Sequence, residues 1–180
     1  MKKFTKISAG ICIAIALTTS AFAADTAVKA SAVQSTPSSD SWTLTLGGSG
    51  TTTTKGDSQT AFGVEVGIGR TGNLLFPIET GVRQSIGYAS GNGGNTVFGT
   101  KLYNDWTVLK VKSVDVFAGG NAGATYGNVP LEFSAAPEAG LRWWLKKDVA
   151  VVGRIEYPFS LNSGKAADKL DYSLAFQVKF

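Results

Sequence analysis

The feature of this sequence that most constrains its fold is a strict alternation of apolar and polar residues. From Tyr172 to Phe180 every second residue is large and apolar, and the residues between them are small or polar. Because successive side chains of a strand point to opposite faces, this segment predicts a strand with one apolar and one polar face. The same period of two recurs through the 180-residue chain from Ser41 onward, and no segment has a convincing helical period.

Seven further strands are predicted upstream of this segment. Together, the eight predicted strands lie near residues 42–46, 62–69, 78–88, 97–111, 114–126, 138–145, 149–157 and 172–180. The register of segment 97–111 is ambiguous, and we favour the one that turns Lys101 and Asp105 away from the apolar face. That face then carries Phe98, Leu102, Trp106 and Val108.

The connections between these strands alternate in length. Short turns are predicted at 70–75, 112–113 and 146–148, and longer connections rich in Gly, Ser, Asn and Thr at 47–59, 89–96, 127–133 and 160–169. Short turns on one rim and long loops on the other predict an all-β fold, an eight-stranded antiparallel up-and-down β-barrel with both termini on the short-turn side. An even number of strands lets the last strand close against the first, so no edge is left free.

Such a barrel either hides its apolar face inside or turns that face to lipid. A secretory signal, aromatic residues near strand ends and a small or charged opposite face all favour the transmembrane form. Glycines recur on the opposite face, at Gly67, Gly69 and Gly81 among others, and would leave an apolar interior underfilled. We therefore predict a transmembrane β-barrel and keep a soluble periplasmic lipid-binding barrel as an alternative.

The N-terminus has the organisation of a secretory signal peptide. Three lysines within the first six residues precede a short apolar run from Ile7 to Leu17, and Ala21-Phe22-Ala23 forms a small-residue cleavage site. Cleavage after Ala23 assigns 1–23 to the signal peptide, 24–40 to a flexible periplasmic leader and 41–180 to the barrel. Without those lysines the net charge falls from +4 to about +1, which removes support for nucleic-acid binding.

Charged residues on the predicted polar face form the group with the most chemical content. Four acids and three arginines fall there: Glu65, Glu79, Arg83, Glu138, Arg142, Arg154 and Glu156. Charges in a narrow interior are costly unless they are paired, so we expect one Arg–carboxylate network that plugs the lumen. Catalysis is not expected, because the sequence has no histidine and the arginines would keep the carboxylates ionised. We expect neither a metal site nor a cofactor.

The C-terminal strand carries a resemblance to a known family. A signal peptide, eight alternating strands and the ending Tyr172-Ser173-Leu174-Ala175-Phe176-Gln177-Val178-Lys179-Phe180 resemble the small outer-membrane β-barrel proteins of the OmpA/OmpX type. The resemblance implies that the barrel-assembly machinery recognises the last strand through Tyr172, Phe176, Val178 and Phe180. It also implies a place in the bacterial outer membrane of a Gram-negative envelope, with lipid around the barrel.

The function expected from these observations is non-enzymatic. We predict a porin-like, monomeric outer-membrane barrel with a structural or surface-interaction role through long extracellular loops, and the sequence does not identify the surface ligand. A narrow pore or a ligand-binding outer-membrane barrel stays open as an alternative. Enzymes among the small outer-membrane barrels generally rely on a histidine paired with serine or aspartate, and this chain has no histidine to supply that pair.

Overall fold

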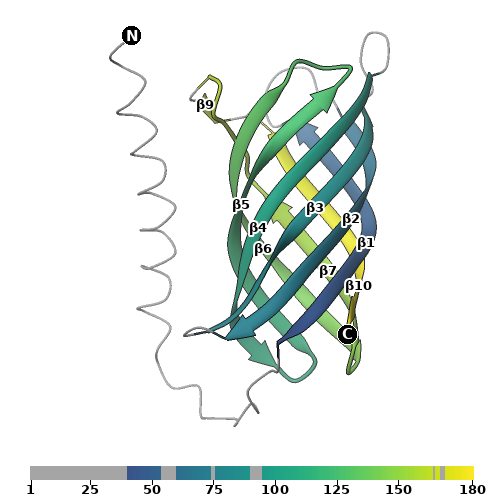
Figure 1. Cartoon of the computed structure of the whole chain (residues 1–180), viewed down its shortest axis with the longest axis vertical. Helices are drawn as coiled ribbons and strands as arrows, with labels where there is room; N and C mark the ends of the chain where they lie inside the picture. Colours follow the sequence, from purple (N-terminus) through teal and green to yellow (C-terminus); the bar gives the residue numbers. More distant parts are fainter. Residues whose placement is uncertain (1–39, 54–59, 74–75, 90–94, 164, 167–168) are drawn as a thin grey trace, which may run out of the picture. The chain divides into compact units, whose positions relative to one another are not determined.

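A computed structural model describes residues 40–53, 60–73, 76–89, 95–163, 165–166 and 169–180. It contains eight long antiparallel strands (Figure 1). They are β1 (Ser41–Thr53), β2 (Thr60–Asn73), β3 (Pro77–Ala89), β4 (Asn95–Val111), β5 (Val114–Gly127), β6 (Glu132–Lys146), β7 (Val149–Glu156) and β10 (Lys169–Lys179). Two short strands, β8 (Phe159–Ser160) and β9 (Lys165–Ala166), form a small hairpin beside β6. No helix in the described ranges is long and apolar enough to cross a membrane.

The sheet closes on itself, because β10 pairs with both β7 and β1 and each other long strand pairs with its neighbours in sequence. The eight-stranded antiparallel barrel predicted from the sequence is therefore confirmed. A row of directly paired residues that starts at Ser41 passes around the barrel and returns to β1 at Thr51, ten positions further along. Such a shift means that the strands run tilted to the barrel axis, as closed barrels require.

The two faces of the sheet differ in chemistry, and the apolar face is the outer one. Phe62, Leu102 and Leu174 are 64–65% exposed, whereas most buried side chains are polar or charged. Among the described residues, the buried apolar set is limited to Tyr103, Phe117, Val152 and four alanines. The interior therefore lacks the apolar lining that a soluble lipid carrier needs, and the outer face suits contact with lipid.

Strand β4 follows the register favoured from the sequence over most of its length. Leu102 and Val108 are exposed, and Asp105 is buried. The pairing with β5 shifts between Thr107 and Leu109, so Val108 and Leu109 are both exposed. The shift is a β-bulge, which inserts one unpaired residue and breaks the alternation that the sequence otherwise shows.

The connections at the end opposite the termini are shorter than expected. β1 continues to Thr53 and β2 begins at Thr60, so the prediction of a loop over 47–53 is wrong. Glycines disfavour strands on their own, but this segment lies between β10 and β2 and pairs with both. The expected loop 160–169 contains the second half of the β8–β9 hairpin. The other end has two-residue turns at 112–113 and 147–148.

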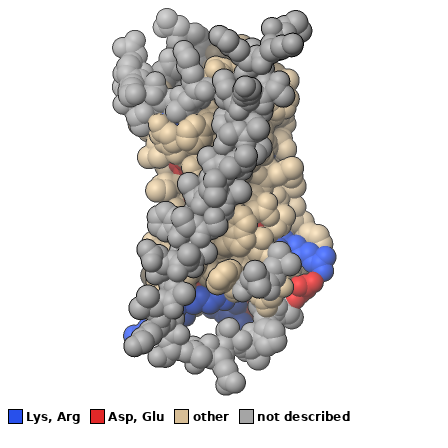
Figure 2. Space-filling model, turned by 90° about the vertical axis from the view of Figure 1, so that its left-hand side faces the viewer, with Lys and Arg blue, Asp and Glu red and all other residues tan. Residues whose placement is uncertain are grey.

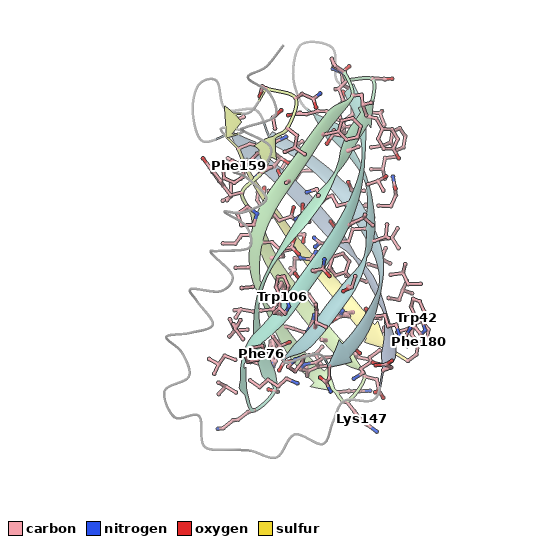
Figure 3. All side chains as sticks on the ribbon, turned by 60° about the vertical axis from the view of Figure 1, so that its left-hand side comes forward. Trp42, Phe76, Trp106, Lys147, Phe159 and Phe180 are labelled. Carbon is pink, nitrogen blue, oxygen red and sulfur yellow. The ribbon has the colours of Figure 1, made fainter. Side chains whose placement is uncertain are left out.

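Aromatic and charged residues mark the end of the barrel that carries the short turns. Trp42, Phe76 and Phe180 lie toward this end, and Phe159 lies toward the other (Figure 3). Figure 2 shows Lys and Arg gathered at the short-turn end of the face in view, whereas the visible surface above them is mostly of other residue types. An apolar band bounded by aromatic and charged residues is typical of a barrel whose rims meet lipid headgroups.

Several polar side chains on the outer face are paired with one another. The Thr80 hydroxyl donates a hydrogen bond of 2.6 Å to the Asn104 side-chain carbonyl. The Thr100 hydroxyl donates to Gln84 at 2.7 Å, and the Gln84 amide donates to the Tyr126 hydroxyl at 3.0 Å. Because lipid offers no hydrogen-bond partner, this pairing lowers the cost of polar groups on this face.

Candidate functional site in the barrel lumen

The lumen holds all seven charged residues that the sequence assigns to the polar face. Glu65 comes from β2, Glu79 and Arg83 from β3, Glu138 and Arg142 from β6, and Arg154 and Glu156 from β7. Each is at most 6% exposed. Each lies at one of the alternate strand positions whose side chains point into the barrel. Closure of the barrel then places strands from opposite walls across the lumen from one another.

Arg83 lies at the centre of the largest ion-paired group. Its guanidinium donates to the carboxylates of Glu138 at 2.5 Å and Glu156 at 2.8 Å. Lys101 on β4 also reaches Glu156, at 2.5 Å, and Asp171 on β10, at 3.2 Å. The group therefore spans the lumen from β3 and β4 to β6, β7 and β10.

Glu79 and Arg142 form a second group, nearer the short-turn end of β3. The Arg142 guanidinium donates to Glu79 at 2.6 Å. Three neutral donors add to this pair: the hydroxyls of Thr43 and Tyr103, at 2.9 and 2.8 Å, and the amide of Gln177, at 2.8 Å. A buried carboxylate with this many donors is well compensated for the loss of water.

Arg154 and Glu65 form the third group. The guanidinium donates to Glu65 at 3.0 Å and lies 3.4 Å from the Ser173 hydroxyl. The described ion pairs of the lumen thus fall into three groups that share no carboxylate. The sequence predicts one continuous Arg–carboxylate network, and the structure instead has three separate ion-paired groups in the lumen.

Two aromatic rings, Tyr103 and Phe117, lie between the three groups, and neither is among the site residues predicted from the sequence. The Arg83 guanidinium lies 4.2 Å from the centre of the Tyr103 ring, and that of Arg154 lies 6.0 Å from it. Phe117 lies 5.4 Å from Arg142 and 5.9 Å from Arg154. Cation–π contacts of this kind join the ion-paired groups through the rings. Inward parity on β4 and β5 is the signal that could have found both residues.

Room for the Tyr103 ring comes from two glycines on neighbouring strands. A Cβ atom at Gly69 would clash with the Tyr103 hydroxyl, and one at Gly81 would come within 2.7 Å of the ring. The inward glycines that argue from sequence against an apolar core therefore have a positive role here. They let a large aromatic ring lie close to the barrel wall.

The lumen also contains acids that the predicted set omits. Asp105 and Asp115 are buried, Asp171 is 19% exposed, and Glu132 and Lys169 line the loop-side end. Among the described residues the lumen therefore holds eight acids against three arginines and two lysines. Asp115 accepts a hydrogen bond from the Trp144 indole at 2.8 Å. The lumen therefore has an excess of negative groups.

Five of these acids lie on a single row of paired residues. The row runs through Glu79, Asp105, Gly119, Glu138, Glu156 and Asp171. Because the strands are tilted, the row climbs the wall from the short-turn end toward the longer connections. A Cβ atom at Gly119 would come within 2.5 Å of Asp105, so the glycine leaves room for the two flanking carboxylates.

Above these groups, toward the longer connections, the lumen opens into a cavity of about 700 Å³. Its lower part is lined by charged residues of the ion-paired groups: Glu65, Lys101, Glu156 and Asp171. Its walls combine serines, threonines and glycines from β1 to β5 and β10 with apolar residues such as Val97, Phe98 and Leu131. The lumen is thus filled by side chains in one part and hollow in the other.

The four predicted assembly residues lie on the outer face of β10. Tyr172, Phe176, Val178 and Phe180 are 37–69% exposed. β10 closes the barrel against β1, and the Tyr172 ring occupies the space over Gly50, where a Cβ atom would lie 2.6 Å from the ring. These residues form one apolar stripe at the closing seam, and their recognition by the assembly machinery remains a prediction.

The carboxylates of the lumen are arranged for ion pairing. Glu65 and Glu79, which lie on adjacent strands, pair with two different arginines. Within the described ranges, no group of three or more Asp, Glu, His or Cys residues is placed to hold a metal ion.

Comparison with known proteins places the fold. No family profile and no curated protein matches the sequence. The crystal structure of neisserial surface protein A (NspA) matches 81% of this chain and all of its own, with 10% identity and a TM-score of 0.55. That of the outer membrane protein OprG from Pseudomonas aeruginosa matches 83% of this chain and 99% of its own, with 12% identity and a TM-score of 0.51. At these identities the likeness is one of fold: the chain has the architecture of small eight-stranded outer-membrane barrels.

Proposed function

We propose that this protein is a non-enzymatic β-barrel of the Gram-negative bacterial outer membrane, with a lumen closed by ion-paired side chains and a role exerted at its loop end. The exposed apolar outer face and the likeness of fold to outer-membrane barrels support the membrane location. The main support for a closed lumen is that the three buried arginines form ion pairs with acids on the opposite wall of the barrel.

These ion pairs cross the lumen because their strands are not neighbours. Arg83 on β3 meets Glu138 on β6, and Arg154 on β7 meets Glu65 on β2. At least two strands separate the partners in either direction around the barrel. Eight strands enclose a space only wide enough for side chains, so bonded pairs across it leave little room for ions.

Conductance in planar lipid bilayers tests the closed lumen. The mature wild-type protein should give no steady single-channel steps. Arg83→Ala or Arg142→Ala, each of which removes a bond across the lumen, should introduce a small leak. A steady ohmic conductance of the wild type that neither substitution changes would contradict the proposal and support a narrow pore.

Export and assembly are part of the same proposal. Residues 1–23 act as the signal peptide. The barrel-assembly machinery recognises the apolar stripe of Tyr172, Phe176, Val178 and Phe180. The monomeric barrel binds a surface partner through its longer connections. Labelling of cysteine variants in intact cells tests the orientation, because Cys12 lies in the signal peptide. Ser163→Cys on the loop side should react with an impermeant maleimide, and Ser113→Cys in a short turn should not. The reverse pattern would contradict the proposed orientation.

A further inference from the structure

We propose that the loop-side cavity of the lumen is a binding site for a small organic ammonium ion. The cavity measures about 700 Å³, which lies within the usual range for small-molecule sites. The inference rests on the proposed closed lumen, because ion-paired side chains form the floor of the cavity. The proposed ligand at the loop end is therefore a small organic cation.

Small residues that point into the barrel form the walls of the cavity. Ser49, Gly63, Ser85, Gly87 and Gly99 line it from four consecutive strands, β1 to β4. Toward the short-turn end, larger inward side chains fill the same lumen, among them the buried Arg83, Tyr103 and Gln177. The change from small to large inward residues along the strands leaves one half of the barrel open.

The charge of the cavity favours cations. Among its described lining residues are four carboxylates, against the ammonium groups of Lys101 and Lys169. The carboxylates belong to Glu65, Glu132, Glu156 and Asp171. Lys101 is already held by Glu156 and Asp171. A concave site with an excess of one charge attracts small ions of the opposite sign.

Glu65 supplies a specific anchor for an ammonium group. Its side chain is 6% exposed and lines the cavity. The Oε1 atom accepts a hydrogen bond of 3.0 Å from the Arg154 guanidinium, and an ionised carboxylate has acceptor capacity for further donors. A charged donor such as an ammonium N–H forms the stronger kind of hydrogen bond to such an acceptor.

The walls around Glu65 suit the remainder of a short amine. The hydroxyls of Ser49, Ser85 and Ser173 line the same cavity and can bond a second polar group of the ligand. Val97 and Leu131 add apolar surface for a few methylene groups. The site therefore fits a compact amine better than a dianion or a bulky apolar molecule.

Calorimetric titration of the mature barrel in phosphatidylcholine nanodiscs tests the site, with empty nanodiscs as the blank. Putrescine is the probe, and butanediol and succinate are neutral and anionic ligands of similar length. We expect putrescine to bind and each of the other two to bind at least about tenfold more weakly, because neither offers Glu65 a charged donor. Butanediol binding as tightly as putrescine would overturn the proposal.

Two variants locate the binding. Glu65→Gln should weaken putrescine binding about tenfold or more. Because this change also deprives Arg154 of its partner, Ser85→Phe provides a second test that retains every described ion pair. Ser85 is paired with Glu65 across the β2–β3 ladder, so a phenyl ring there fills the cavity and should abolish binding. Asp148→Asn in a short turn at the other end is the control and should bind as the wild type does.

Failure of this site and failure of the closed lumen give different results. If putrescine does not bind, or binds Ser85→Phe as well as wild type, the cavity site is refuted while zero conductance still supports the closed lumen. If the wild type conducts steadily in bilayers, the floor of the cavity is open. That result refutes the closed lumen and the site built on it.

Discussion

Truncation of Arg83 to alanine should strongly destabilise the barrel. The side chain is 2% exposed and bonds Glu138 and Glu156. Lys101 still holds Glu156 in the variant, whereas Glu138 loses the cation with which it pairs among the described residues and keeps the amide of Asn121. The uncompensated charge therefore falls mainly on Glu138. Breaking a buried pair by removing one partner costs about 3–5 kcal/mol. We expect the free energy of unfolding to fall by roughly this amount. The cation–π contact with Tyr103 is lost in the same variant and adds to the effect.

Urea-induced unfolding in lipid vesicles, followed by tryptophan fluorescence and by the gel mobility of the folded form, measures this loss. Lys147→Ala, at the exposed short-turn rim (Figure 3), is the matched control and should leave the unfolding midpoint unchanged. Arg83→Met combined with Glu138→Leu should recover much of the stability, because an apolar pair replaces a buried ionic pair at little cost. Wild-type stability of Arg83→Ala, or no recovery in the double variant, would refute the reasoning.

Two further substitutions and one measurement on the unchanged protein test other parts of the molecule. Tyr103→Phe keeps the ring beside Arg83 but removes the hydroxyl that donates to Glu79, so the same assay should show a loss of about 1–3 kcal/mol, and unchanged stability would show that this bond contributes nothing. Phe176→Asp puts a charge on a lipid-facing position that is 62% exposed. The cost of about 2–4 kcal/mol near the midplane should prevent insertion, and normal insertion would mean that this face does not meet lipid. Mass spectrometry of envelope-purified protein should find Ala24 as the first residue, and retention of Met1 would contradict the proposed signal peptide.

Much of the fold was predictable because strand alternation is a local property. The side chain at each position points to one face or the other, so parity alone assigned Glu138 and Arg142 to the lumen and Leu141 to the outer face. The strand order followed from the alternation of short turns and longer connections along the chain. The upper half of β1 was not predictable in this way. Its strand conformation depends on pairing with β10, which lies at the far end of the chain.

The sequence by itself determined that charged residues would face a narrow interior, and hence that they would need partners. Only the tertiary structure decided which partners meet. Arg154 and Glu65 are 89 positions apart, and Arg83 and Glu138 are 55 apart. Whether two inward side chains lie at the same height depends on the ten-residue shift around the closed barrel and on the bulge in β4. Both are properties of how all eight strands pair, and no local pattern encodes them. The same closure left the small inward residues of β1 to β4 on one side of an open cavity instead of against a packed core.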